Sequence, residues 1–263
     1  MDLGIKDRVA LVAASSKGLG RAVAWSLARE GVKLVICARN KETLEQTAED
    51  ILMKTGVTVF PLVVDLADSD QIDWMVTETL DLFRKVDILV TNAGGPPAGG
   101  FSDLCDEQWM KAAQLTLMSA VRLVKGVLPG MRKQKWGRII HLTSVSLKQP
   151  IDNLLLSNVF RPGVAGMGKS LSRELAQDNI LVNTLCPGYF LTDRVKELFR
   201  QQSEETGKTP EEIETSVRQM IPLGRLGNPE ELADTVAFLA SERAKYITGA
   251  VLQVDGGYIN GLL

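Results

Sequence analysis

A glycine-containing turn follows the first apolar run of the chain, and its residue types could bind a phosphate group. The turn reads Ala13-Ala14-Ser15-Ser16-Lys17-Gly18-Leu19-Gly20-Arg21 and leads directly into an amphipathic stretch. Glycines between a strand and a helix let the backbone approach a pyrophosphate, and the helix N-terminus supplies amide donors and a favourable dipole. Two glycines also fit an ordinary turn, but the position after a first strand favours a dinucleotide site. The expected cofactor-binding residues here are Ala14, Ser16, Lys17, Gly18, Leu19 and Gly20.

The end of the second apolar run, Val35-Ile36-Cys37-Ala38-Arg39-Asn40, indicates which dinucleotide is bound. A carboxylate at this position would bind a ribose 2′-hydroxyl, whereas an arginine suits a 2′-phosphate. Lys17 adds a second positive charge from the glycine turn. The residues therefore predict NADP(H) rather than NAD(H), although Arg39 would also fit a plain solvated strand end.

Rare residue types exclude several other kinds of site. The three cysteines, Cys37, Cys105 and Cys186, have no paired spacing, so we expect neither a disulfide framework nor a zinc site. The single histidine, His141, excludes a His-rich metal site, and no metal is expected. A Ser-His or Cys-His hydrolase would have to use His141. We interpret His141 as a partly buried residue of a strand.

Length and composition are those of a globular protein. The 263 residues are 45% hydrophobic and 24% charged, with a net charge of −2 and no basic surface of the kind that nucleic-acid binders carry. The longest uncharged stretch, Ile88 to Ser102, has 15 residues and is too short to span a membrane. The polar start, Met1 to Arg8, does not resemble a signal peptide. We expect a cytoplasmic protein that binds neither membrane nor nucleic acid.

The elements that would position these residues alternate between strands and helices. Apolar runs predict strands, and amphipathic stretches between them predict helices. This alternation predicts one α/β domain over residues 1–263, a Rossmann-type doubly wound parallel sheet of about seven strands with helices on both faces. A substrate-covering segment is expected at about 189–222, with its polar part Gln201–Glu214 the most mobile. The expected strands are Val9–Ala14, Lys33–Ala38, Val57–Val64, Val86–Thr91, Arg138–Ser144, Ile180–Leu185 and Ala250–Val254, and the expected helices are Gly18–Glu30, Lys41–Thr55, Ser69–Arg84, Asp106–Lys133, Asn158–Gln177 and Pro229–Ser241.

Five motifs in order resemble those of the short-chain dehydrogenase/reductase family. They are the glycine turn, Val63-Val64-Asp65-Leu66, Thr91-Asn92-Ala93-Gly94, Asn183-Thr184-Leu185-Cys186-Pro187-Gly188 with Thr192, and a tail from Gly224 to Gly257 similar to the 3-oxoacyl-(acyl carrier protein) reductase branch. The resemblance implies that Asp65 and Leu66 contact the adenine, and that Asn92, Ala93, Gly94, Pro187, Gly188 and Thr192 also bind the cofactor. It further implies a homotetramer formed through the long helices and the C-terminal strand.

One departure from the family lies in the turn itself. Ala14 stands where the family has its first turn glycine, so we expect a narrower turn without easy access to positive φ.

The catalytic positions depart further from the family pattern. The resemblance implies a serine, a tyrosine, a lysine and an asparagine; these positions fall on Ser144, Ser157, Arg161 and Thr116. A serine is a much weaker acid than a phenol, whose pKa is about 10, and an arginine cannot release a proton as a lysine can. A positioned acid or base contributes about 10²–10⁴ in rate, while proximity contributes up to about 7–11 kcal/mol. We therefore expect reductase chemistry to be weakened rather than abolished.

Two other residues are candidate proton donors, and the family positions have a second interpretation. Lys148 lies four residues after Ser144, and Tyr189 follows the Pro187-Gly188 turn. Ser157 and Arg161 are one helical turn apart and could instead bind a carboxylate or phosphate of the substrate.

Two functions remain open from the sequence. The first is an NADP(H)-dependent oxidoreductase that interconverts a small carbonyl compound and an alcohol, resembling 3-oxoacyl reductases. The alternative is a catalytically degenerate dinucleotide-binding or regulatory protein. A hydrolase that uses His141 lacks an identifiable acid partner.

Overall fold

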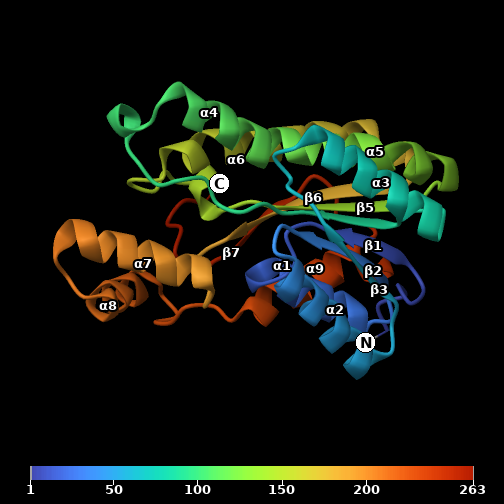
Figure 1. Cartoon of the computed structure of the whole chain (residues 1–263), viewed down its shortest axis with the longest axis horizontal. Coiled ribbons are helices and arrows are strands. Elements are labelled where there is room, and N and C mark those ends of the chain that lie inside the picture. Colours follow the sequence, from blue (N-terminus) through green and yellow to red (C-terminus); the bar gives the residue numbers. More distant parts are fainter. Residues whose placement is uncertain (1, 263) are drawn as a thin grey trace.

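The protein is built around one parallel β-sheet. The computed structural model describes residues 2–262, and within them a seven-stranded sheet has the order β3-β2-β1-β4-β5-β6-β7 (Figure 1). The order reverses between β1 and β4, and ligands of such sheets bind at the carboxyl ends of the strands beside this reversal. The strands are β1 Val9–Val12, β2 Lys33–Ala38, β3 Val59–Val63, β4 Ile88–Thr91, β5 Gly137–Leu142, β6 Ile180–Pro187 and β7 Val251–Val254.

Helices cover both faces of the sheet, which confirms the predicted doubly wound α/β fold (Figure 1). One layer contains α1 (Gly18–Arg29), α2 (Lys41–Thr55) and α9 (Pro229–Ala240). The other contains α3 (Ser69–Phe83), α4 (Asp106–Ala112), α5 (Ser119–Gln134) and α6 (Leu155–Glu174). None of the helices in the described part of the chain is long and apolar enough to cross a membrane.

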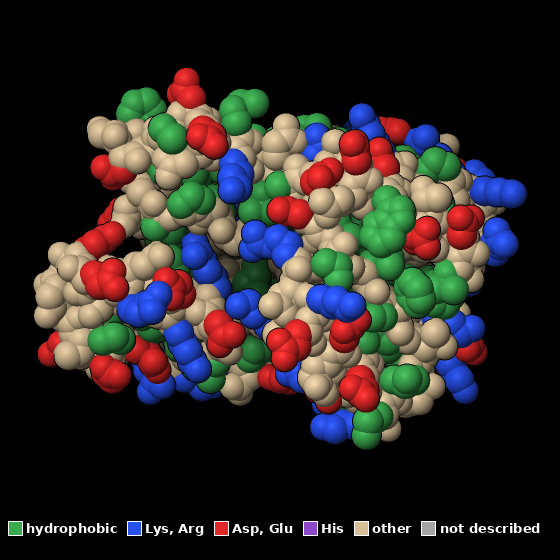
Figure 2. All heavy atoms as spheres, viewed as in Figure 1, with side chains coloured by type: hydrophobic (Ala, Val, Ile, Leu, Met, Phe, Trp, Pro, Cys, Tyr) green, Lys and Arg blue, Asp and Glu red, His purple; other side chains and the backbone are tan. Residues whose placement is uncertain are grey.

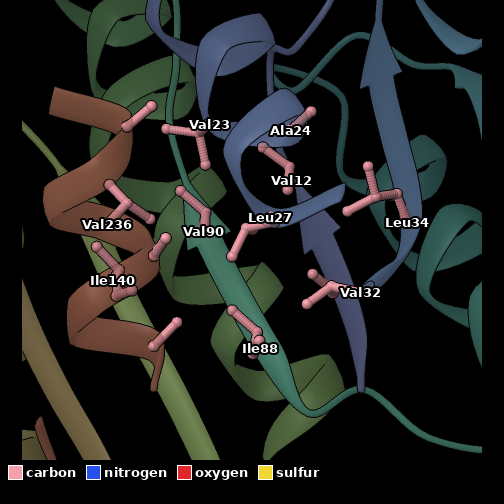
Figure 3. Packing of buried hydrophobic residues seen from close by; sticks show 14 of the residues in the cluster. Val12, Val23, Ala24, Leu27, Val32, Leu34, Ile88, Val90, Ile140 and Val236 are labelled. Carbon is pink, nitrogen blue, oxygen red and sulfur yellow. The ribbon is translucent and has the colours of Figure 1, made fainter. Parts of the chain in front are cut away.

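The two faces have separate hydrophobic cores. On the α1/α9 face, Val23 and Leu27 lie against Val12 and Val90 of the sheet, with Val236 of α9 beside them (Figure 3). Leu27 has no exposed surface, and truncating such a leucine to alanine typically costs about 2–5 kcal/mol. The two cores hold the strands in place, and the carboxyl ends of the strands position the residues of the candidate site described below.

The sequence predicted one uninterrupted helix over Asp106–Lys133, and this was wrong in one detail. A π-helical turn, Ala113–Met118, separates α4 from α5. The Ser119 hydroxyl donates to the Leu115 carbonyl within this region. Such π turns are rare and frequently mark functional sites.

The segment after β6 also differs from its prediction. It forms two helices, α7 (Asp193–Thr206) and α8 (Pro210–Met220), which stand beside the sheet at the left of Figure 1. The polar stretch Gln201–Glu214 is thus largely helical. These helices have a small hydrophobic core of their own, which contains Phe199, Ile213 and Val217. The segment is polar overall, but its few apolar residues lie together on the buried side of the helices.

Candidate functional site

A large cleft lies at the carboxyl ends of the strands. Its volume is about 1410 Å³, above the range of about 300–1,000 Å³ that is usual for small-ligand pockets. The space-filling view shows a hollow beside α7 with lysine and arginine side chains at its rim (Figure 2). Most of the predicted site residues line this cleft: Ala14, Ser16, Lys17, Gly18, Leu19, Arg39, Asp65, Leu66, Asn92, Ala93, Gly94, Ser144, Ser157, Arg161, Pro187, Gly188 and Thr192.

The glycine turn has the shape of a phosphate-binding turn despite its alanine. Ala14 adopts φ +50° and Gly18 adopts φ +58°, so the turn takes positive φ at the alanine in spite of the cost that the sequence predicted. A left-handed alanine costs roughly 1–2 kcal/mol, and the fold holds it there. Position 20 requires glycine because the helix backbone lies against the turn: a Cβ atom there would be 2.2 Å from the Ala14 carbonyl oxygen. The side chain of Asn92 donates to the same oxygen at 3.3 Å and fixes the turn against β4.

Lys17, at the N-cap of α1, and Arg39, directly after β2, are two cations at this side of the cleft. Lys17 and Arg39 are both exposed and both line the cleft. Among residues 2–262 neither forms an ion pair. Asn40, the next residue, caps α2 by accepting from the Thr43 amide at 2.9 Å. The cap fixes the backbone beside Arg39 and leaves its guanidinium free for an anion.

Hydrogen bonds hold Asp65 in place and use only one of its two carboxylate oxygens. Its backbone amide donates to the side chain of Gln71 at 2.8 Å, and its Oδ1 accepts from the Ala67 amide at 2.9 Å. The other oxygen, Oδ2, makes no hydrogen bond within residues 2–262. It can accept from an amino group in the cleft.

The wall opposite the glycine turn comes from the segment after β6. A Cβ atom on Gly188 would lie 2.9 Å from the Cα atom of Asp255, so glycine is needed where β6 meets the end of β7. Thr192 caps α7 by accepting from the Val195 amide at 3.4 Å. A Cβ atom built on Gly18 would lie 3.6 Å from the methyl carbon of Thr192, so the glycine turn and the start of α7 are close to each other here.

Ser144, Ser157 and Arg161 meet at one end of the cleft. Ser144 Oγ accepts from the Ser146 amide at 3.1 Å, which leaves its hydroxyl proton free to donate. Ser157 and Arg161 lie on one face of α6, and Arg161 Nη1 donates to the Thr143 carbonyl at 2.6 Å. Burial, with the charge of Arg194 as a smaller cause, lowers the pKa of Arg161 to about 10. Arg161 therefore keeps its positive charge at neutral pH.

α6 begins earlier than the sequence predicted. Asn158 resembled a helix start, but its side chain instead binds the preceding loop, with Nδ2 donating to the Ile151 carbonyl at 2.9 Å and Oδ1 accepting from the Ile151 amide at 3.1 Å. The helix starts at Leu155, so Ser157 lies inside the first turn.

Thr116 lies behind this end of the cleft, in the π turn. It lines a separate small cavity of about 10 Å³, together with Asn92, Thr143 and Arg161. Thr116 Oγ1 and Arg161 Nε are buried and have no hydrogen-bond partner within the described chain. A polar cavity of this size has room for one water molecule, which could bind both atoms.

Neither of the two alternative proton donors is well placed for that role. Lys148 is not among the described residues that line the cleft, and its charge acts instead on the buried Cys186 thiol. Tyr189 lines the cleft, but its ring packs against Phe199 and Tyr258. Burial and the hydrogen bond with Tyr258 raise the pKa of Tyr189, which makes it a weaker acid.

His141 is a core residue and lies outside the cleft. It has no exposed surface, and its Nδ1 forms a hydrogen bond of 2.7 Å with Thr91 Oγ1. Burial lowers its pKa to about 4, so the ring is neutral at pH 7. A hydrolase site at His141 has no support in this geometry.

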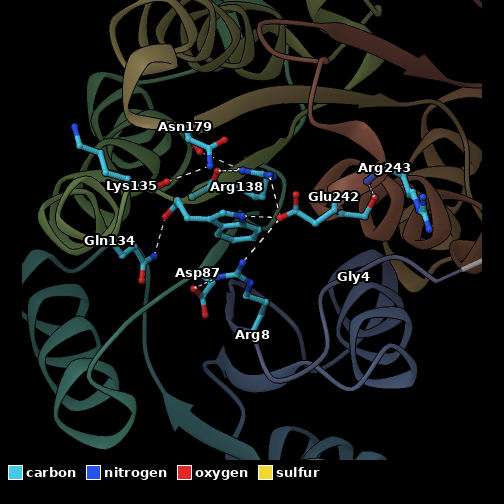
Figure 4. A network of polar contacts seen from close by, with 12 residues as sticks. Gly4, Arg8, Asp87, Gln134, Lys135, Arg138, Asn179, Glu242 and Arg243 are labelled. Atoms are coloured by element: carbon cyan, nitrogen blue, oxygen red, sulfur yellow. Dashed lines mark hydrogen bonds and ion pairs between the residues drawn. The ribbon is translucent and has the colours of Figure 1, made fainter.

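A second polar cluster lies at the opposite edge of the sheet, where the strands begin. The guanidinium groups of Arg8 and Arg138 lie 3.7 and 4.2 Å from the ring centre of Trp136, whose Nε1 donates to Glu242 Oε1 at 2.7 Å (Figure 4). The buried Asp87 accepts from Arg8 at 3.2 Å. These contacts join β1, β4, β5 and the end of α9, which gives the cluster a structural role.

Comparisons with known proteins agree with this geometry. A family model described as enoyl-(acyl carrier protein) reductase matches residues 13–259. The 3-oxoacyl-(acyl carrier protein) reductase FabG of Aquifex aeolicus is 35% identical over 257 residues, covering 98% of this chain and 99% of the relative. The chain belongs to the short-chain dehydrogenase/reductase family. It falls in the branch that resembles FabG and is an oxidoreductase, as the sequence motifs predicted.

Solved structures of this family share the whole fold. The L-sorbose reductase of Gluconobacter frateurii, complexed with NADPH and L-sorbose, has a TM-score of 0.95 and 36% identity over 100% of both chains. The actinorhodin polyketide ketoreductase with NADPH has a TM-score of 0.93 and 32% identity, covering 97% of this chain and 98% of the other. The predicted fold class is thereby confirmed.

Proposed function

We propose that this member of the family is an NADP(H)-dependent oxidoreductase that interconverts a carbonyl compound and an alcohol by hydride transfer. The proposal rests on Lys17 and Arg39, two cations that line the cleft near the glycine turn and form no ion pair within residues 2–262. The solved L-sorbose reductase and actinorhodin ketoreductase, which share the fold, are both complexed with NADPH.

The residues present fit this cofactor. The left-handed turn at Ala14 and Gly18 and the N-terminus of α1 suit a diphosphate. Lys17 and Arg39 suit a 2′-phosphate, and the free oxygen of Asp65 suits the adenine amino group. When bound, the cofactor supplies the hydride. Pro187, Gly188 and Thr192 form the wall that would hold its nicotinamide end, and α7 and α8, within 189–222, would cover the substrate.

Ser144, Ser157 and Arg161 would act on the carbonyl group. The two hydroxyls can donate to the carbonyl oxygen, and the charge of Arg161 stabilises the negative charge that develops there. Because Arg161 is buried, this charge is screened less than a surface charge would be. The alkoxide of the product and a serine alkoxide have comparable basicity, so Ser157 Oγ can pass its proton to the product alkoxide. The serine alkoxide then takes a proton from a solvent water molecule, and hydroxide is released to the solvent.

A turnover assay tests these roles. With NADPH and a panel of small ketones and 3-oxoacyl thioesters, nicotinamide absorbance should fall, and Arg161→Met should lower kcat by about 10²–10³. Arg161→Lys keeps the charge and should retain most of the activity. Equal rates for Arg161→Met and the unmodified protein would exclude Arg161 from the reaction.

The second candidate is a dinucleotide-binding protein without turnover. The sequence resemblance implies that Ser157 of α6 occupies the position of the family's tyrosine, and a serine is a much weaker acid than a phenol, which favours this candidate. The same assay separates the two functions: tight binding of NADPH without turnover of any carbonyl compound in the panel would support the second.

A further inference from the structure

Two arginines lie at the catalytic end of the cleft. Arg161 and Arg194 both line the cleft, from α6 and from the first turn of α7. Within residues 2–262, neither forms an ion pair with a carboxylate. Their like charges repel, since the charge of Arg194 lowers the pKa of Arg161. An anion between or beside them would relieve this repulsion.

Arg194 is held in a defined position. Its Nη2 donates to the Pro96 carbonyl at 2.9 Å, which joins α7 to the loop after β4. Its guanidinium lies directly on Gly95, where a Cβ atom would be only 2.9 Å from Nε and Nη2. Only glycine at this position lets the guanidinium lie there. A charged group that is already ordered loses little entropy when it binds a ligand.

Arg161 also has unused hydrogen-bonding capacity. Nη1 is bound to Thr143, but Nε is buried and has no hydrogen-bond partner in the described part of the chain. Nη2 makes no hydrogen bond within the described residues, and it is not one of the fully buried polar atoms, so it retains some exposed surface. Ser144 and Ser157 lie at the same end of the cleft.

The acidic residues nearby do not neutralise this pair. Glu197 lines the cleft and its charge partly offsets the lowering of the Arg194 pKa by burial, but its carboxylate forms its ion pair, of 2.7 Å, with Arg200 on the same helix. Asp193 of α7 and Glu107 of α4 also line the cleft, but within residues 2–262 neither forms an ion pair with an arginine or a lysine. The positive charge at this end is therefore available to a ligand, separately from the charges of Lys17 before α1 and Arg39 after β2.

We propose that the substrate is a small oxo acid, whose carboxylate binds Arg194 while its carbonyl oxygen lies at Ser144, Ser157 and Arg161. The inference rests on the proposed function and adds its substrate class. Arginine suits a carboxylate because its planar group presents parallel N–H donors. Arg161 is bound to Thr143 after β5 and Arg194 to Pro96 after β4, and β4 and β5 are neighbouring strands, so we expect one small molecule to reach both guanidiniums. Arg194 is then the residue that determines specificity.

Equilibrium binding tests this inference without depending on turnover. Isothermal titration measures acetoacetate and its ethyl ester against the protein saturated with NADP⁺, so that no reduction occurs. The acid should bind more tightly than the ester, and Arg194→Gln should weaken the acid by roughly 10- to 100-fold and the ester by less than about threefold. Lys196→Gln is the matched control, because it removes a positive charge from the same helix outside the cleft lining and should leave both affinities unchanged.

Each other outcome has a defined meaning. Equal losses for acid and ester, or tighter binding of the ester to the unmodified protein, would overturn the inference. Weaker NADPH binding by Arg194→Gln would assign Arg194 to the cofactor's phosphates and would also overturn it. Dihydroxyacetone phosphate bound more tightly than acetoacetate, with the same dependence on Arg194, would replace carboxylate by phosphate. Failure of NADP⁺ to bind would instead contradict the proposed function, and the acid and ester would then be compared on the free protein.

Discussion

The close approach of Gly20 to the glycine turn gives a prediction that can be worked from the structure. In Gly20→Ala the new Cβ would lie 2.2 Å from the Ala14 carbonyl oxygen and 3.0 Å from Asn92 Nδ2. Ordinary contact begins near 3.4 Å, so the turn or α1 must move by about 1.2 Å. Overpacking of this kind costs about 1–3 kcal/mol of stability. The same shift would misalign the amides that bind the diphosphate, and loss of one charge-assisted hydrogen bond weakens binding by roughly 10- to 100-fold.

Urea unfolding measures the loss of stability in Gly20→Ala. Titration with NADPH, followed by nicotinamide fluorescence, measures its loss of cofactor affinity. Gly166→Ala is the control, because it lies within α6 and its Cβ would meet nothing within 4 Å. This control should gain about 0.5–1 kcal/mol from better helix propensity and bind NADPH normally. Unchanged NADPH affinity in Gly20→Ala would refute the assignment of this turn to the diphosphate.

Three further predictions follow from the site and the core. Arg39→Asp should lower the preference for NADPH over NADH by at least about tenfold in the same titration, because it replaces attraction of the 2′-phosphate with repulsion; an unchanged ratio would place recognition elsewhere. Ser157→Tyr combined with Arg161→Lys should raise kcat by about 10²–10⁴ by supplying a phenolic acid, and no increase would show that proton transfer does not limit the rate. Burial lowers the pKa of His141 to about 4 from an unfolded value near 6.5, so the unfolded state binds its proton first as the pH falls. The free energy of unfolding should therefore fall by about 3 kcal/mol between pH 6.5 and pH 4, and His141→Gln should remove this slope in urea titrations.

The sequence predicted the sheet and the cofactor end of the cleft well, for a physical reason. Apolar strands that are buried on both faces leave a strong local pattern, and the residues that end them must converge at one edge of a parallel sheet. Lys17, Arg39, Asp65 and Asn92 accordingly line one cleft or hold its turn. The assignment of individual residues to the cofactor, the homotetramer and the cytoplasmic location stay predictions.

The catalytic end was harder to predict because tertiary contacts determine it. Arg194 was not identified, since one arginine in a polar segment has no distinctive pattern; its contact with Gly95 and Pro96 exists only in the fold. The sequence Gly94-Gly95-Pro96 was the feature that could have indicated this contact, because a glycine allows another group to lie directly against the backbone. The π turn at Thr116 was also missed, since it depends on packing between helices rather than on residue propensity.

The measurement that tests the central claim most directly is a titration of the purified protein with NADPH and NADH, followed by nicotinamide fluorescence. The structure predicts saturable binding of both, with NADPH at least tenfold tighter because of Lys17 and Arg39. Equal affinities would contradict the assignment of the 2′-phosphate to these two cations. Failure to bind either nucleotide would contradict the proposed function as a whole.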